Sequence, residues 1–332
     1  MRHVPESRDP EASPGIDWVG TLLAFGGLGS VAFALIALPE RDARGLSLVA
    51  YFSVGALMLV AFVWHEGRAR SPIMPLHLFR SRAFSGINLM TLLLYGALSG
   101  AFFLLPFDLI QVHGYSATLA GAVFLPFTVI MGLLSRWSGG LLDRIGARLP
   151  LIIGPTITGV GFTLIALAGP TTSYWIGFLL PTAIVGLGMA ITVAPLTTTV
   201  INAVPAHQTG VASGINNSVA SVATLLAIAI FGAVGLSSFN RALDQHLATP
   251  SLSSSARKAI ESTRGRFVID SSLTTALGAD RSAVEAIVKT SLAEGIRIAM
   301  LLAAALALVS AACAEFTIRP GEGRRIAGQP NP

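Results

Sequence analysis

Asp108 is the clearest ionisable residue inside a long apolar stretch of this sequence, where it stands in Leu-Pro-Phe-Asp-Leu-Ile-Gln. A carboxylate within a membrane is costly, and such residues usually bind a proton, an ion or a substrate. Asp108 is therefore a candidate for binding a proton or a cationic substrate. The alternative is a carboxylate about one helical turn from a loop, in contact with interfacial water beside His113 and Tyr115. The position near the loop favours this alternative, and the functional interpretation stays open.

Two adjacent amides, Asn216 and Asn217, lie well inside another apolar stretch, after Gly210-Val-Ala-Ser-Gly214. A buried amide needs hydrogen-bond partners. These side chains could bind a substrate, or they could bond to a neighbouring helix. Bonding between helices is the commoner use in membrane bundles, so we expect it here and keep substrate binding as the alternative.

Glycines, one acid and two arginines recur at regular spacing in Gly139-Gly-Leu-Leu-Asp143-Arg144-Ile-Gly146-Ala-Arg148. Glycine permits a sharp turn, and Asp143 can pair with an arginine or cap the next helix. Arginines hold such a loop at the cytoplasmic surface. An ordinary basic loop would contain similar residues, but the regular spacing favours a functional motif.

Signatures of catalysis and of metal binding are not found in the sequence. All six histidines fall in tails, in loops or at the ends of apolar stretches, and no His-Glu-x-x-His, Gly-x-Ser-x-Gly or Walker motif occurs. An intramembrane enzyme needs a nucleophile and a base, or metal ligands, at membrane depth. We therefore expect no enzyme activity, no metal site and no ATP-driven transport from this chain.

The candidate residues must be positioned by helices, because the composition indicates a polytopic membrane protein. Of the 332 residues, 53% are hydrophobic and only 12% are charged, and the mean hydropathy is +0.70. Soluble domains carry about twice that share of charged residues, and about 20 apolar residues span a bilayer as a helix. We predict an all-α membrane protein with about eight transmembrane helices. They cover 17–38, 46–64, 84–111, 116–137, 149–168, 174–204, 210–236 and 294–316.

The distribution of arginine predicts the orientation of these helices. Twelve arginines lie in the tails and connections on one side, against Arg41 and Arg44 in the short loops on the other. The positive-inside rule then places both termini in the cytoplasm. The twelve are Arg2, Arg8, Arg68, Arg70, Arg80, Arg82, Arg136, Arg144, Arg148, Arg319, Arg324 and Arg325.

The long connection at 237–293 carries further basic residues on the outer side, but loops of this length follow the rule weakly. Within it, the spacing of apolar residues predicts short surface helices at 256–260 and 282–290. Membrane topology accounts for the net charge of +5, so nucleic acid is not expected as a partner.

The motif at 139–148 resembles the cytoplasmic loop of the major facilitator superfamily, which reads Gly-x-x-x-Asp-Arg-x-Gly-x-Arg. That loop lies between the second and third helices of a six-helix half, and the match falls at this place if 84–316 is counted as such a half. The matching residues are Gly139, Asp143, Arg144, Gly146 and Arg148. The two spans within 17–64 then resemble the additional helix pair of the fourteen-helix drug:proton antiporters.

Other stretches resemble the same family. Val4-Pro-Glu-Ser-Arg-Asp-Pro10, followed by Asp17-Trp18, looks like its linker after the sixth helix. Ser71-Pro-Ile-Met-Pro-Leu-His-Leu-Phe79 resembles its entry to the ninth helix, and Ala212-Ser-Gly-Ile-Asn-Asn217 resembles the start of its thirteenth. The resemblance implies a division into a cytoplasmic linker at 1–16, an additional helix pair at 17–64, a cytoplasmic loop at 65–83, a six-helix transporter half at 84–316 with an extracytoplasmic loop at 237–293, and a cytoplasmic tail at 317–332.

The sequence also departs from the family. The first six helices, with the antiporter motif and the usual proton-coupling acid, have no counterpart in it. Family members tend to carry Arg-Gln and a glycine pair after the asparagines, where this chain has Ala220-Ser221 and Ala223-Thr224. An aromatic residue often stands where this chain has Asp108.

The resemblance implies a portion of a proton-coupled efflux transporter for multiple drugs or other small molecules, in the inner membrane of a bacterium. A proton gradient, and no bound cofactor, would supply the energy. The implied partners are the lipid bilayer, hydrophobic or cationic small molecules, and a separate N-terminal six-helix half. Because transport in such a fold uses a site between two halves, export by this chain alone is not expected. The alternative is a non-transporting remnant or assembly partner with the same fold.

Overall fold

The computed structural model describes residues 17–37, 45–69, 72–169, 171–247, 253–267 and 280–318, and these ranges contain helices and connections but no strand. The predicted linker at 1–16 and the tail beyond residue 318 lie outside them. The helices are α1 (Trp18–Ala37), α2 (Gly45–Glu66), α3 (Arg82–Phe107), α4 (Ala117–Ala122), α5 (Leu125–Ile145), α6 (Arg148–Ala166), α7 (Leu180–Asn202), α8 (Thr209–Leu247), α9 (Ser254–Ser262) and α11 (Arg281–Thr317).

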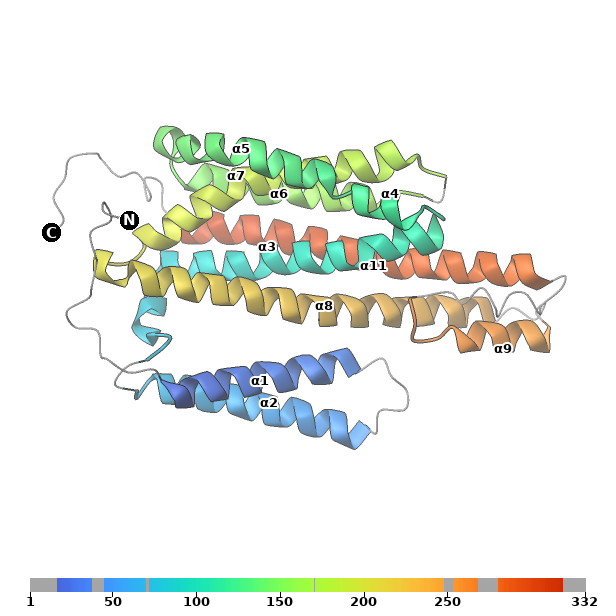
Figure 1. The fold of residues 1–332 in the computed structure, drawn as a ribbon, viewed down its shortest axis with the longest axis horizontal. Coiled ribbons are helices and arrows are strands. Elements are labelled where there is room, and N and C mark those ends of the chain that lie inside the picture. The colour runs from blue at the N-terminus through green and yellow to red at the C-terminus, as the bar shows by residue number, and fades with distance from the viewer. Residues whose placement is uncertain are drawn as a thin grey trace.

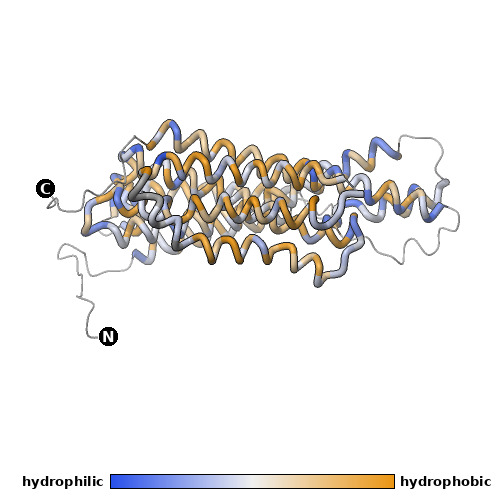
Figure 2. Tube along the Cα trace, turned by 90° about the horizontal axis from the view of Figure 1, so that it is seen from above, coloured by the Kyte–Doolittle hydropathy of each residue, from blue (hydrophilic) through white to orange (hydrophobic). Residues whose placement is uncertain are grey.

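The helices have the lengths and composition of membrane spans. Within the described residues, seven helical stretches are long and apolar enough to cross a membrane, and the apolar part of α1, Trp18–Ala34, is slightly shorter. Figure 2 shows an apolar central band with hydrophilic residues at both ends of the molecule. The predicted all-α membrane fold is confirmed.

Two groups of helices lie side by side. The α1–α2 hairpin stands apart from the remaining helices in Figure 1, and it contacts them through α1 and α8. In the larger group, α3 packs against α8 and α11, α6 packs against α7 and α11, and α5 packs against α7. The first turn of α1 and the last turn of α11 lie at the same end of the molecule (Figure 1).

Small residues allow the backbones of α6 and α7 to come close together. A Cβ on Gly188 of α7 would lie 2.5 Å from the carbonyl oxygen of Gly154 and 2.4 Å from Oγ1 of Thr158, both on α6. Helix association in lipid depends on such close packing, because no hydrophobic effect drives two apolar helices together there. Glycine is therefore required at this crossing.

Proline shapes three of the helices. Pro106 lies near the end of α3, which continues as a π-helical turn at Asp108–Val112, and Pro181 follows another π-helical turn at Trp175–Leu179. The predicted single span at 116–137 is instead two helices, α4 and α5, which are interrupted at residues 123–124. Pro126 explains the interruption, because its ring clashes with the carbonyl of Ala122 and it has no N–H to donate.

Two helices are much longer than the predicted spans. Helix α8 continues to Leu247 rather than ending near residue 236, and α11 begins at Arg281 rather than at residue 294. The segment 282–290 is thus the first part of α11 and not a separate surface helix, because Val284 and Val288 continue its buried face. The helix expected at 256–260 is present as α9, but Ala256 and Ile260 are buried in the fold.

Candidate functional site

Asp108 lies in the π-helical turn that follows α3, and it is buried, with 8% of its surface exposed. This burial differs from the expectation of a carboxylate in open contact with interfacial water. The π-helical turn has one extra residue compared with an α-helical turn, and such turns are often found at functional sites. The role of Asp108 in binding a proton or a substrate stays a prediction.

His113 closes over Asp108. Its Nδ1 atom lies 3.8 Å from Oδ1 and 3.3 Å from the backbone oxygen of Asp108, and its Nε2 atom lies 3.3 Å from the carbonyl oxygen of Gly169. The two ring nitrogens thus lie close to oxygens of Asp108 and Gly169, which stand five and 56 positions from His113 in the sequence, and the ring bridges the two segments. The rings of Phe178 and His113 pack in a T-shaped arrangement with their centres 4.8 Å apart, which shields His113 from solvent.

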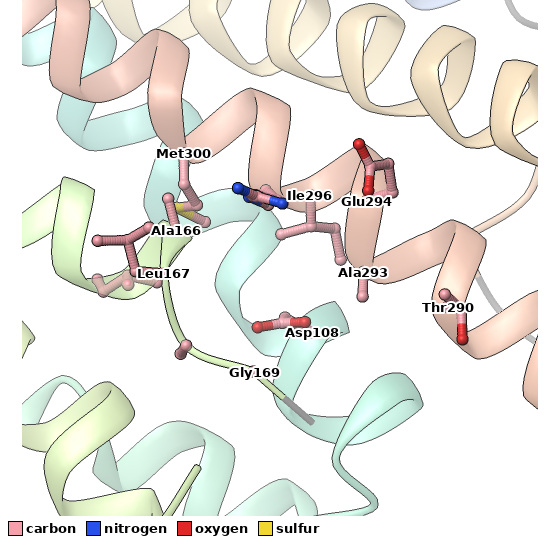
Figure 3. A pocket seen from close by; sticks show the side chains of 12 residues that line it. Asp108, Ala166, Leu167, Gly169, Thr290, Ala293, Glu294, Ile296 and Met300 are labelled. Atoms are coloured by element: carbon pink, nitrogen blue, oxygen red, sulfur yellow. The ribbon is translucent and has the colours of Figure 1, made fainter. Parts of the chain in front are cut away.

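A pocket of about 310 Å³ adjoins Asp108 between the end of α6 and the middle of α11. Figure 3 shows the Asp108 carboxylate between Gly169 on one side and Ala293 of α11 on the other. The walls are largely apolar, and Glu294 and Arg297 add one acidic and one basic group at the α11 side. The pocket therefore combines an apolar lining with a small number of charged groups, which is typical of small-molecule sites.

Asn216 joins α8 to α3. Its Nδ2 donates to Oδ1 of Asn88 at 3.2 Å and to Oγ1 of Thr91 at 2.8 Å, and all three side chains are buried. The amide of Asn88 donates in turn to the carbonyl of Phe84 at 2.9 Å. In the structure, Asn216 thus bonds to a neighbouring helix, the commoner of the two uses considered for it. The neighbouring Asn217 is exposed on the surface of α8 and takes no part in the cluster.

The motif at 139–148 spans the end of α5 and the start of α6. Gly146 has a φ of +77°, a left-handed conformation that glycine adopts without strain, and it makes the turn between the two helices. The guanidinium of Arg148 forms an ion pair with Glu315 near the end of α11 and also donates to its carbonyl oxygen at 3.4 Å. The side chains of Asp143 and Arg144 and the surroundings of Gly139 lie outside the described part of the structure.

Metal binding has no evident place among these groups. Within the described residues, no three His, Cys, Asp or Glu side chains come together in a way that could hold a metal ion.

Sequence comparison gives the family of this fold. Residues 12–228 match the profile of the Major Facilitator Superfamily. The chain belongs to the major facilitator superfamily.

Several curated members of the superfamily are similar to the chain. The multidrug resistance protein Stp of Mycobacterium tuberculosis is 29% identical over 237 residues, which cover 71% of this chain and 44% of that protein. The tetracenomycin C resistance and export protein of Streptomyces glaucescens is 29% identical over 321 residues, which cover 94% of this chain and 58% of that protein. The puromycin resistance protein of Streptomyces alboniger is 30% identical over 253 residues, which cover 75% of this chain and 50% of that protein. The chain spans about half the length of these relatives.

A solved structure shares the fold. A bacterial homologue of the human lysosomal transporter Spinster, in an inward-facing and occupied conformation, superposes with a TM-score of 0.60 at 15% identity. The superposition covers 93% of this chain and 67% of that protein. At this identity the likeness shows the major facilitator fold alone.

The contacts that His113, Asn88 and Thr91 make in this major facilitator chain were not predicted from the sequence. His113 stands five positions after Asp108, a spacing that does not share a face of an α-helix but does in a π-helical turn, where the N–H of His113 bonds to the carbonyl of Asp108 at 3.2 Å. Asn88 and Thr91 share a face of α3 at a spacing of three, which is a usable signal for a polar contact between helices.

Proposed function

We propose that the chain provides the additional helix pair and the C-terminal six-helix half of a proton-coupled exporter of hydrophobic or cationic small molecules. The proposed location is the inner membrane of a bacterium, with both termini in the cytoplasm. The names of similar proteins support export, since they describe multidrug resistance, puromycin resistance, and resistance to and export of tetracenomycin C. The match to the superfamily supports transport and not catalysis.

The observation that carries proton coupling is the buried pair of Asp108 and His113 beside a pocket. An acid that is shielded from bulk water and lies next to a second titratable group can hold or release a proton when the pocket opens or closes. In the proposed orientation, this end of α3 faces the outer side, from which protons flow inward. Asp108 would thus take up the proton, and the apolar walls of the pocket would favour hydrophobic cargo.

The proposed exporter also contains a second six-helix half, on the same polypeptide or on another. Alternating access moves two halves about a site near the midplane. Asp108 lies near one end of α3, and the polar groups deeper in the described helices include the Asn88–Thr91–Asn216 cluster, which carries no charge. A group that passes the proton beyond the midplane would therefore belong to the second half, and this chain alone is not expected to export.

The test measures dye movement driven by a pH gradient in liposomes. The complete assembly should transport, the isolated chain should not, and Asp108→Asn should reduce transport by the assembly to background. Glu285→Gln is the matched control, because Glu285 forms only a partly exposed i,i+4 pair with Lys289. Transport at the unmodified rate by the Asp108→Asn assembly would refute the role of Asp108. Absence of transport by every assembly would favour a non-transporting membrane protein.

A further inference from the structure

The open end of the α1–α2 hairpin, where α1 begins and α2 ends, contains a buried carboxylate with one oxygen that has no hydrogen-bond partner. Glu66, the last residue of α2, is 3% exposed. Its Oε2 accepts a hydrogen bond from the backbone N–H of Met74 at 3.0 Å, but its Oε1 is buried without any hydrogen bond. A buried polar atom without a partner is rare and costly, so it calls for an occupant.

The unpartnered oxygen lies near a second carboxylate. A Cβ built on Gly20 of α1 would lie 2.9 Å from Oε1 of Glu66 and 2.7 Å from Oδ2 of Asp17. The two oxygens therefore border the same small space, which remains open because residue 20 has no side chain. Two ionised carboxylates in this arrangement would repel each other, whereas one proton between them would form a hydrogen bond.

The partners of Asp17 show which of the two acids is ionised. Its Oδ1 accepts from the N–H of Gly20 at 2.8 Å, and Nε2 of His65 lies 3.0 Å from Oδ1 and 2.9 Å from Oδ2. A carboxylate only accepts, so His65 donates from Nε2. The hydrogen bond from Gly20, with a further contribution from His65, lowers the pKa of Asp17 below its ordinary value. Asp17 is thus a hydrogen-bond acceptor at this site.

We propose that Glu66, Asp17 and His65 form a proton-binding site, in which Glu66 Oε1 carries the proton and donates it in a hydrogen bond to Oδ2 of Asp17. The site lies at the end of the molecule where α1 begins, opposite the end where α3 leads to Asp108 (Figure 1). It is therefore separate from the proposed outer proton site, and its existence does not depend on transport.

Among the described residues, the next cation along the chain after Glu66 has other partners. The guanidinium of this residue, Arg68, lies 4.3 Å from the centre of the Trp64 ring and donates to the carbonyl of Trp64. The segment that leads into α3 contributes the backbone N–H of Met74. The three side chains of the site are not arranged to hold a metal ion, in keeping with the absence of such a cluster from the described residues.

Protonation of Glu66 would stabilise the contact between the α1–α2 hairpin and the start of the six-helix half. Glu66 links α1, through Asp17, to the segment before α3, through Met74. When Glu66 is protonated, both links are hydrogen bonds. When Glu66 loses its proton, repulsion between the two carboxylates weakens the contact of Glu66 with Asp17, and this end of the hairpin becomes less tightly held.

The proton can be observed directly by infrared spectroscopy on the purified chain in lipid nanodiscs. A titration from acid to alkaline pH should show the C=O band of a protonated carboxyl group disappear, and Glu66→Gln should remove that band while Asp108→Asn leaves it in place. A titration without a band that depends on Glu66 would refute the proposal. A shift of the transition on adding sodium or calcium at constant ionic strength would also overturn it, because it would identify a metal cation as the occupant.

Hydrogen exchange at Met74 tests the proposed coupling. Glu66→Gln keeps a donor towards Asp17 at every pH, so at alkaline pH the Met74 amide should exchange about tenfold more slowly in Glu66→Gln than in the unmodified chain, the effect of one charge-assisted hydrogen bond. Gly20→Ala should abolish this protection, because the added methyl would fill the space between the acids. Gly29→Ala is the control, since nothing lies within 4 Å of its Cβ position. Equal exchange in all variants would refute the coupling.

Discussion

Replacing Asn216 by alanine should weaken the contact between α8 and α3, whereas the same change at the adjacent Asn217 should not. Asn216 is buried and donates to Asn88 and Thr91, and Asn217 is exposed on the same helix. Both substitutions exchange the same side chain for the same methyl group, so their effects on intrinsic helix propensity are equal. The difference between the two variants therefore measures the polar contact.

The structure allows the size of the effect to be estimated. Interhelical hydrogen bonds in membranes contribute about 0.6 kcal/mol each on average, so the loss of two costs roughly 1 kcal/mol. Oδ1 of Asn88 would also lose its donor inside the bundle, which adds about 1 kcal/mol. Thr91 keeps its own bond to the carbonyl of Ile87 at 3.0 Å. We expect a total of about 2 kcal/mol, or roughly a 30-fold change in the unfolding equilibrium.

The assay is reversible unfolding of the purified chain in mixed micelles, followed by circular dichroism as the fraction of denaturing detergent is raised. A double-mutant cycle with Thr91→Val isolates the bond between Asn216 and Thr91, whose coupling should lie between about 0.6 and 1.7 kcal/mol. The reasoning is wrong if Asn216→Ala and Asn217→Ala unfold at the same detergent fraction, or if the cycle shows no coupling.

Three further predictions concern packing, transport and topology. Gly188→Ala should lower the free energy of unfolding by about 1–3 kcal/mol through overpacking against α6. Gly232→Ala should raise this free energy slightly, because nothing lies within 4 Å of its Cβ position. Equal effects of the two variants in the same unfolding assay would contradict this prediction. Asp143→Asn should reduce transport by the complete assembly without reducing expression or substrate binding, and normal transport would show that the motif serves only as a loop. In a background without the native cysteine, a cysteine at Ser253 should react with an impermeant reagent from outside and one at Ser81 only from inside, and the reverse pattern would overturn the proposed orientation.

The helical class and the approximate positions of the spans could be predicted from the sequence, because a run of about 20 apolar residues is a sufficient signal for a span. The full lengths of α8 and α11 could not. Their outer parts are amphipathic, with Val284, Val288 and Leu292 buried at intervals of four residues. A criterion based on uniform hydropathy ends such a helix at the edge of the apolar band, although its buried face continues.

The candidate residues could be selected from the sequence, but their contacts could not. Asp108 and Asn216 stand out in the sequence because they are polar within apolar stretches. The contact of Asp108 with His113 depends on a π-helical turn, and the contacts of Asn216 depend on the neighbouring positions of α3 and α8. The first arrangement needs a turn that α-helical spacing does not predict, and the second needs the pairing of two particular helices. Glu66 lies at the end of an apolar stretch, where a charged residue is ordinary, and only its burial near Gly20 and Met74 distinguishes it.

The uninterrupted length of α11 has a mechanical consequence. Its 37 residues form a rod of about 55 Å, well beyond the roughly 30 Å of a hydrocarbon core. Pivoting such a rod by about 10° around one tip displaces the opposite tip by roughly 10 Å. The ion pair between Arg148 and Glu315 anchors one tip to the α5–α6 turn, while α9 packs along the other. A slight tilt that is hard to detect within the bilayer would thus be magnified outside it, and a fluorophore pair spanning α9 and α5 would act as a gauge of that tilt.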